Sequence, residues 1–207
     1  MEDILDLYAM ARDPEIPLVC MDEKPYQLLD NKLIPIPMKK GAVKKTDYEY
    51  ERKGTCSIFM FTAPHENWRQ TSVREHRTKV DWAEEIHYIM TEVFPHKEKV
   101  CFVMDNLNTH TKGSLYERYP AEIARAILKR MEFHFTPKHG SWLNIAEIEL
   151  SAMERQCLTR RIPDIETLRT ELKTWHTGRN SEQKTVDWQF KTPDARIKLK
   201  RLYPVLI

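Results

Sequence analysis

The sequence is poor in glycine and has no long apolar run. Its 207 residues include only five glycines, and none stands in a GxGxxG or GxxxxGK[ST] pattern. Without such a loop, a dinucleotide-binding fold or a P-loop lacks the backbone that binds phosphate groups. No apolar run approaches the roughly 18 residues of a membrane helix, and the acidic opening MEDILDLYAM is unlike a secretory signal. These absences argue against nucleotide-cofactor enzymes and predict a protein with no membrane partner.

Metal-binding cysteine and histidine motifs are also missing. The four cysteines are widely spaced without a CxxC pair, and the eight histidines form no HExxH or HxH pattern. A zinc ribbon or a zinc hydrolase is therefore disfavoured. Scattered cysteines without a disulfide framework are typical of a cytoplasmic protein.

The charges are nearly balanced but unevenly distributed. The chain has 33 basic and 31 acidic residues, for a net charge of +2. Residues 1–37 contain three basic and eight acidic residues, whereas residues 155–207 contain twelve basic and six acidic ones. The basic end is suited to a polyanionic partner, and an ordinary solvated surface explains it equally well.

The pattern of apolar residues predicts an α/β fold with a mixed sheet and helices on both faces. Short apolar or β-rich runs predict strands at 16–21, 56–61, 68–76, 100–104 and 132–136. Helical spacing predicts helices at 81–94, 114–131, 141–157 and 165–176. We expect Asp164 to cap the last of these helices, and Gly178 to lie just past its end.

An aspartate follows two of the predicted buried strands. Asp22 comes directly after VCM, and Asp105 comes directly after FVM. If these strands are parallel neighbours about 4.8 Å apart, both carboxylates lie at one edge of the sheet. A hard divalent cation such as Mg²⁺ would relieve their repulsion. The alternative for each aspartate alone is a turn or cap residue at the end of a strand.

A third acid comes from the predicted helix 141–157. Helical spacing places Asn144, Glu147, Ser151 and Glu154 along one polar stripe. Spacing favours Glu147 over Glu149 for a site at the sheet edge, because Glu149 shares the helix side of apolar residues. A stripe that merely faces solvent remains the alternative.

Three blocks in this order resemble a known family. The blocks are CMDEK (20–24), MDNLNTH (104–110) and TPKHGSWLN (136–144) followed by Glu147. They resemble the DDE transposases of bacterial insertion sequences, in the branch related to mariner-like elements. The likeness runs from about residue 2 to residue 204 and includes the blocks DYEYERKGTCSIFMF, RRIPDIETLR, VDWQF and DARIKLKRLYP.

The resemblance implies a ribonuclease H-like catalytic domain with a mixed five-stranded sheet. It implies that residues 1–180 form this domain and that residues 181–207 form a basic C-terminal extension. The helix-turn-helix region of the family, which recognises transposon ends, has no counterpart in this sequence. The stretch between Asp105 and Glu147 is somewhat longer than in the mariner branch.

The resemblance also implies the chemistry. Asp22, Asp105 and Glu147 are the expected catalytic residues and the ligands of two Mg²⁺ ions, for which Mn²⁺ can substitute. Asp22 would contact both ions. Two such ions can activate water and stabilise the leaving 3′ oxygen, so the enzyme would cut DNA at transposon ends and join them to target DNA. The implied target contains a TA step, and the implied partners are DNA and a second copy of the chain in the bacterial nucleoid.

Several further residues are candidates for DNA contact. These residues flank the acids and comprise Lys24, Asn108, His110, Lys138 and His139. Each also has a structural interpretation: a turn or cap for Asn108 and His110, an ion pair with the neighbouring catalytic acids for Lys24, and a solvated loop for Lys138 and His139. The basic run RIKLKR (196–201) suits either a DNA-backbone contact or a solvated tail.

Two other functions remain open on the sequence alone. One is an inactive DNA-binding or assembly fragment of a transposase. The other is a ribonuclease H-like nuclease or resolvase, which shares the carboxylates but does not join strands.

Overall fold

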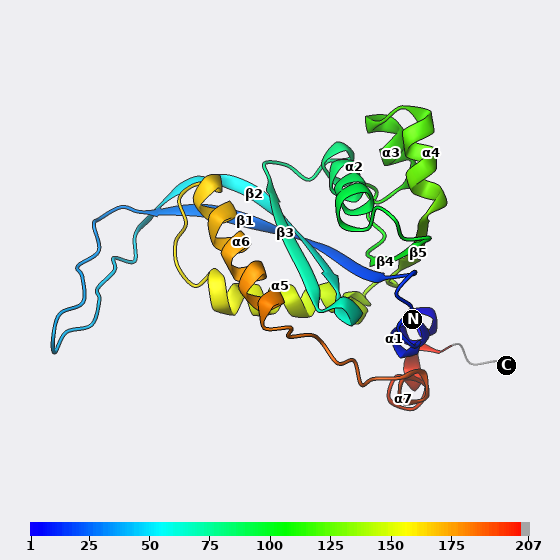
Figure 1. Cartoon of the computed structure of the whole chain (residues 1–207). Coiled ribbons are helices and arrows are strands. Elements are labelled where there is room, and N and C mark those ends of the chain that lie inside the picture. Colours follow the sequence, from blue (N-terminus) through cyan, green and yellow to red (C-terminus); the bar gives the residue numbers. More distant parts are fainter. Residues whose placement is uncertain (204–207) are drawn as a thin grey trace.

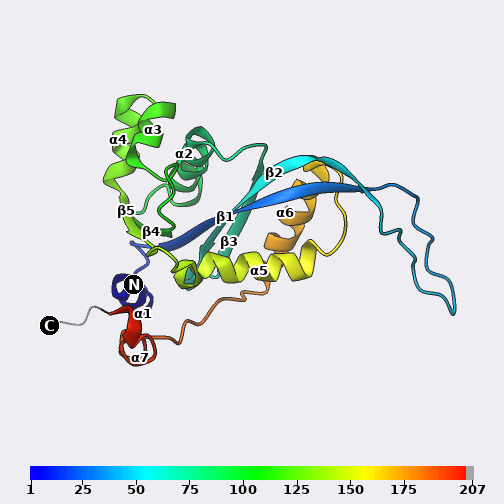
Figure 2. The ribbon, with the colours of Figure 1, turned by 180° about the vertical axis from the view of Figure 1, so that it is seen from behind.

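The protein is built on one five-stranded sheet, seen from two sides in Figures 1 and 2. This computed structural model describes residues 1–203. The strand order is β3-β2-β1-β4-β5. β1 pairs antiparallel with β2 and parallel with β4, so the sheet is mixed as predicted. The strands are β1 (Leu18–Asn31), β2 (Tyr50–Ala63), β3 (Trp68–Arg74), β4 (Val100–Met104) and β5 (Met131–Phe135).

Helices cover both faces of the sheet. One apolar cluster joins the sheet to α1, α5 and α6, and a second cluster joins the opposite face to α2, α3 and α4. The predicted architecture of helices on both faces is therefore confirmed. The helices are α1 (Glu2–Ala9), α2 (Lys79–Tyr88), α3 (Lys112–Arg118), α4 (Ala121–Lys129), α5 (Ile145–Cys157), α6 (Ile165–Ser181) and α7 (Thr192–Lys198).

The start of β1 is apolar on both sides because it lies in the middle of the sheet. Leu18 and Cys20 belong to the cluster under α5, whereas Val19 and Met21 belong to the cluster under α2. Strands with both faces covered are continuously apolar, which is the pattern of the run IPLVCM.

Strand β1 is longer than predicted, and this corrects the placement of Asp22. The prediction ended the strand at Met21, but β2 continues to pair with β1 as far as Asn31. β4 pairs with β1 only from Leu18 to Cys20. Asp22 is therefore not a residue after the strand; it lies within β1, just past the point where β1 loses β4 as a neighbour.

The bounds of the predicted helices also differ from the structure. The helix predicted at 114–131 is split into α3 and α4, since Pro120 has no amide hydrogen to continue the first helix. Helix α6 extends to Ser181, so Gly178 lies inside the helix rather than past its end. Asp164 caps α6 as predicted, accepting a hydrogen bond from Thr167 N at 2.8 Å.

The hairpin of β1 and β2 extends into a long arm, residues 32–49, that projects away from the sheet (Figure 1). Arg161 holds the base of the arm by donating hydrogen bonds to the carbonyl oxygens of Asp47, Tyr48 and Glu49. The rest of the arm is mostly exposed, including several large apolar side chains: Leu33, Ile34, Ile36, Met38 and Val43.

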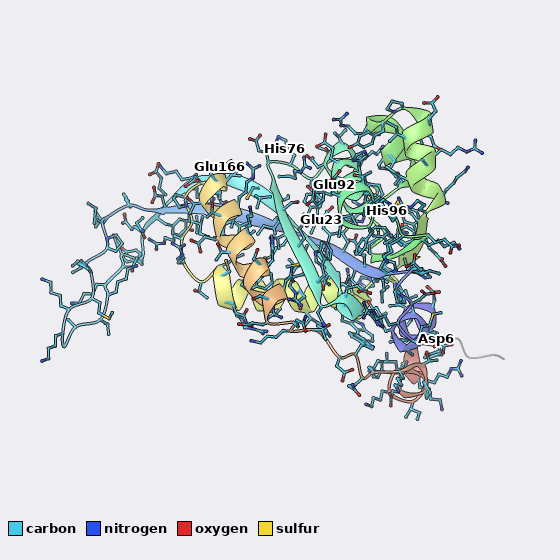
Figure 3. All side chains as sticks on the ribbon, in the orientation of Figure 1. Asp6, Glu23, His76, Glu92, His96 and Glu166 are labelled. Carbon is cyan, nitrogen blue, oxygen red and sulfur yellow. The ribbon has the colours of Figure 1, made fainter. Side chains whose placement is uncertain are left out.

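Residues after α6 return across the molecule to α1. Thr192 and Arg196 of α7 bond to Asp6 and Glu2 of α1 at 2.6 and 2.7 Å, and Figure 3 labels Asp6 on this helix. The predicted extension 181–207 lies partly outside the described residues, which end at 203. Among the described residues, no helix has both the length and the hydrophobicity of a membrane span.

Candidate active site

Asp22 and Asp105 lie side by side at one edge of the sheet. In the parallel pair of β1 and β4, Cys20 is opposite Val103. Continuing this register by two residues places Asp22 opposite Asp105, at the point where β4 has ended. Because side chains alternate along a strand, Asp22 shares the face of Cys20, which is the face that α5 covers.

Glu147 lies in the first turn of α5, and one asparagine fixes that turn against β1. Asn144 caps the helix by accepting a hydrogen bond from Ala146 N at 3.2 Å. Its Nδ2 atom donates to the carbonyl oxygen of Met21 at 2.7 Å. The start of α5 is therefore tied to the residue that precedes Asp22.

The pKa of Asp22 reports the proximity of the three acids. It is raised to about 7, first by burial and then by the negative charges of Glu147, Asp105 and Glu23, while a hydrogen bond from Glu23 N opposes the rise. The structure thus brings Asp22, Asp105 and Glu147 together, with Glu147 exposed and the two aspartates partly buried.

Glu149, the rival acid, points elsewhere. Its side chain is 1% exposed and lies 3.3 Å from Arg69 Nε and 3.2 Å from Arg179 Nη2. The two arginines hold Glu149 in the interior between β3, α5 and α6. The preference for Glu147 agrees with this geometry.

His110 is buried rather than exposed at the edge. Its Nε2 atom lies 3.0 Å from Glu23 Oε1, and its Nδ1 atom lies 2.8 Å from Asp105 Oδ1. Burial alone lowers the pKa of His110, but these hydrogen bonds outweigh it and raise the pKa to about 9. The predicted DNA contact is therefore wrong for His110 in this structure, because both ring nitrogens bond within the protein.

Glu23 is the residue that sequence reasoning missed. Figure 3 labels it near the centre of the sheet, toward the side where α2 packs. Its side chain is 1% exposed, and Arg77 Nε lies 3.4 Å from its second carboxylate oxygen. The position of Glu23 next to Asp22, at the end of an apolar run, could have indicated its role. A charged side chain that is buried in a sheet needs a partner of opposite charge or a hydrogen bond.

Of the other predicted DNA-contact residues, one is held in an ion pair and three are exposed. Lys24 Nζ pairs with Glu154 at 2.9 Å and not, as the alternative interpretation expected, with one of the three acids. Asn108, Lys138 and His139 are exposed. Lys138 and His139 stand on a tight turn in which Gly140 packs against Pro137 so closely that an added Cβ would lie 2.6 Å from Pro137 Cγ.

The three acids fit a hard divalent cation. They offer only oxygen ligands, which Mg²⁺ and Mn²⁺ prefer. Burial, followed by the negative charges of Glu147, Asp105 and Glu23, raises the pKa of Asp22. A bound cation would compensate these charges.

A mixed sheet in this order, with helices on both faces, is the ribonuclease H-like fold. Within this fold, residues 17–169 match the family described as DDE superfamily endonuclease. The chain belongs to this family, which confirms the predicted DDE endonuclease. No curated protein matches the sequence closely enough to count as a relative.

Solved structures share the fold at low sequence identity. The Mos1 mariner paired end complex with Mn matches with a TM-score of 0.58 and 16% identity, covering 88% of this chain and 54% of the other. The catalytic domain of Mos1 mariner transposase matches at 0.55 and 12%, covering 88% and 81%. A simian T-cell lymphotropic virus intasome matches at 0.52 and 9%, covering 96% and 60%. This chain thus spans about half the length of the chain in the Mos1 paired end complex.

Proposed function

We propose that this protein is a transposase catalytic domain that cleaves DNA strands and joins the freed 3′ ends to target DNA. The observation that supports this most strongly is the register of β1 and β4, by which Asp22 lies opposite Asp105. Asn144 ties the first turn of α5, with its Glu147, to Met21 O. Three acids at one sheet edge provide a site for phosphodiester chemistry, and the family and the Mos1 neighbours favour transposition.

Asp22, Asp105 and Glu147 would hold divalent metal, with Mg²⁺ as the natural ion and Mn²⁺ as a substitute. We propose two ions. Bound metal supplies an activated water and charge stabilisation for the leaving oxygen. The carboxylates themselves fix where the metal and the scissile phosphate lie.

Glu23 and His110 would act as positioning residues for Asp105. His110 bridges Glu23 and Asp105 from the side of the sheet opposite α5, and its cationic form compensates the charge of both acids. His110 Nδ1 bonds to the carbonyl oxygen of Asp105 at 3.1 Å and lies 2.8 Å from its carboxylate, so the ring would restrict the position of Asp105. We expect His110→Asn to weaken Mn²⁺ affinity more than it weakens DNA affinity.

The DNA backbone would cross the exposed turn at Lys138 and His139. This turn is followed by a short 3-10 helix (Ser141–Leu143) and then by α5, which contains Glu147, so a phosphate on Lys138 would be guided toward the acids. We also assign Asn108, which is exposed after β4, to this surface. Lys24 would contribute after release from the partly exposed Glu154. A TA step in the target is consistent with this chemistry, since such steps deform easily.

The active assembly would be a homodimer, because joining two transposon ends requires two sites. The arm of residues 32–49 is suited to contact the second copy. Ile34 at its edge is 93% exposed, and the arm has further exposed apolar residues that the protein itself does not cover.

The direct experiment is nicking of supercoiled plasmid by the 207-residue protein with Mg²⁺ or Mn²⁺. We expect metal-dependent nicks that Asp105→Asn abolishes, while binding of the DNA persists. Nicking that survives this substitution, or that needs no metal, would refute the proposal. DNA binding without any nicking would favour the assembly-fragment alternative, and nicking without joining of 3′ ends would favour a nuclease or resolvase.

A further inference from the structure

We propose a second metal site, separate from the three acids, in which Cys101, Glu132 and His134 bind Zn²⁺ between β4 and β5. The three residues lie on one face of the sheet. Cys101 of β4 is directly opposite Glu132 of β5, and His134 follows Glu132 by two residues. Nothing in the proposed DNA chemistry uses these side chains.

The ligand atoms are already close to the separations that Zn²⁺ requires. Tetrahedral zinc with ordinary Zn–S and Zn–N bonds places its ligand atoms about 3.3–3.6 Å apart. In this structure His134 Nε2 lies 3.5 Å from Glu132 Oε1, and Cys101 Sγ lies 3.9 Å from Glu132 Oε2. All three ligand atoms fall within 4.8 Å of one another. Because the two shorter distances involve different oxygens of Glu132, binding one ion requires the side chains to move inward.

An aspartate on α1 orients the histidine as a ligand. His134 Nδ1 lies 2.9 Å from Asp3 Oδ2, so a proton on Nδ1 is shared with this carboxylate. Nε2 then presents its lone pair, and this atom is buried without a hydrogen-bond partner. A carboxylate that holds one ring nitrogen while the other faces the metal is the usual arrangement around zinc-binding histidines.

The surroundings permit a cation. Lys99 Nζ lies 4.0 Å from Glu132 Oε2, but the lysine side chain is 49% exposed and can turn into solvent. Cys101 is buried, which together with the nearby Glu132 raises the pKa of its thiol to about 11. Zinc binding would displace the thiol proton to solvent, one proton for each ion bound.

The proposed ion would join three elements. Cys101 and Glu132–His134 tie β5, the edge strand, to β4, and Asp3 adds α1 to the same network. Because β4 leads into Asp105, the site would stabilise the strand that positions one of the acids. Sequence patterns miss such a site because the cysteine and the histidine are 33 residues apart and follow no zinc motif.

The test is titration of the metal-free Asp105→Asn protein with Co²⁺, which reports a thiolate ligand by near-ultraviolet charge-transfer absorption. Asp105→Asn weakens cation binding at the three acids, so the outcome does not depend on the proposed DNA chemistry. We expect a thiolate band that saturates at one equivalent. Zn²⁺ should displace the Co²⁺ and raise the melting temperature of the same protein.

Matched variants assign the ligands. Cys101→Ser should remove the band, whereas Cys157→Ser, which changes a half-buried cysteine of α5, should keep it. His134→Gln retains the thiol and should lower the affinity for Co²⁺ at least ten-fold. Asp3→Asn should lower the same affinity by about ten-fold. Absence of the band in Asp105→Asn, or a band unchanged in Cys101→Ser or His134→Gln, would overturn the proposal.

Discussion

Asp22 destabilises the metal-free protein at neutral and alkaline pH. Its pKa rises from 3.8 in the unfolded chain to about 7 in the fold, so the folded protein holds a proton that the unfolded chain releases. The free energy of unfolding of the metal-free protein therefore falls as the pH rises from about 4 to about 7, because the unfolded chain releases the Asp22 proton first. This stability cost comes first from burying the carboxylate and then from the nearby charges of Glu147, Asp105 and Glu23.

We expect Asp22→Asn to stabilise the metal-free protein at pH 8. Three pKa units correspond to about 4 kcal/mol, which is an upper limit for the gain. The gain should shrink steadily as the pH falls toward 4, because both forms then become neutral at this position. Thermal unfolding across this pH range measures it, with Asp30→Asn in the same strand as the control. A gain that does not change with pH would contradict the assigned burial and charge.

Glu147 and Glu149 make a matched pair of substitutions. Glu147→Gln changes an exposed side chain and should abolish nicking while the free energy of unfolding changes by less than about 0.5 kcal/mol. Glu149→Gln leaves Arg69 and Arg179 without their buried anion and should destabilise the protein by about 3 kcal/mol. Urea denaturation with a nicking assay on each variant separates the two effects. The reverse pattern would mean that the catalytic acid is Glu149.

The sequence, through its resemblance to the DDE transposases, predicts Asp22, Asp105 and Glu147 as one site, but it does not describe their neighbours. Spacing along the helix only favoured Glu147 over Glu149, and the resemblance to the DDE transposases selected it. The structure places Glu149 against two arginines. His110 was assigned to the surface because a His after a polar loop has no pattern that reveals burial. Its partner Glu23 is 87 residues away, and only the folded sheet brings the two together.

At the scale of helices and strands, Asn144 connects the start of α5 with strand β1 beside the three acids. The residue was predicted within a polar helical stripe, but it is the cap of α5 and its bond to Met21 O crosses from helix to sheet. Strand positions were predictable because buried central strands are continuously apolar. The length of β1 could not be predicted, because its second half pairs only with β2 and mixes polar with apolar residues.

Asn144→Ala should therefore lower both stability and activity. Loss of the cap and of the buried hydrogen bond to Met21 O should cost about 2 kcal/mol. Nicking should fall further than stability explains, because the turn that holds Glu147 is no longer tied to β1. Asp164→Ala, which removes the cap of α6 away from the acids, is the control. We expect it to cost about 1 kcal/mol and to leave nicking unchanged. Equal losses of nicking in both variants would argue against a role for the hydrogen bond from Asn144 to Met21 O.

At the scale of the whole molecule, the arm of residues 32–49 is a mostly exposed segment that is bound to the rest of the protein at its base by Arg161. Its sequence mixes lysines with apolar residues and gives no periodic signal, so its projection could not be predicted. We expect replacement of residues 33–46 by four Gly and Ser residues to leave the fold intact, because Arg161 still binds the carbonyls of residues 47–49.

The shortened protein should fail to dimerise on DNA. Analytical ultracentrifugation with and without DNA measures this, and an arm with Lys39, Lys40, Lys44 and Lys45 changed to Ala separates apolar from charged contacts. We expect the lysine variant to dimerise. A dimer that survives removal of the arm would place the interface elsewhere.

The central claim is that three acids, distant in sequence, form one metal-binding site. Calorimetric titration of Mn²⁺ into the protein and into Asp22→Asn, Asp105→Asn, Glu147→Gln and Cys101→Ser tests it most directly. We expect each of the three acid substitutions to weaken Mn²⁺ binding by at least ten-fold, and Cys101→Ser to leave it unchanged. Mn²⁺ affinity that persists in any of the three acid variants would contradict the account.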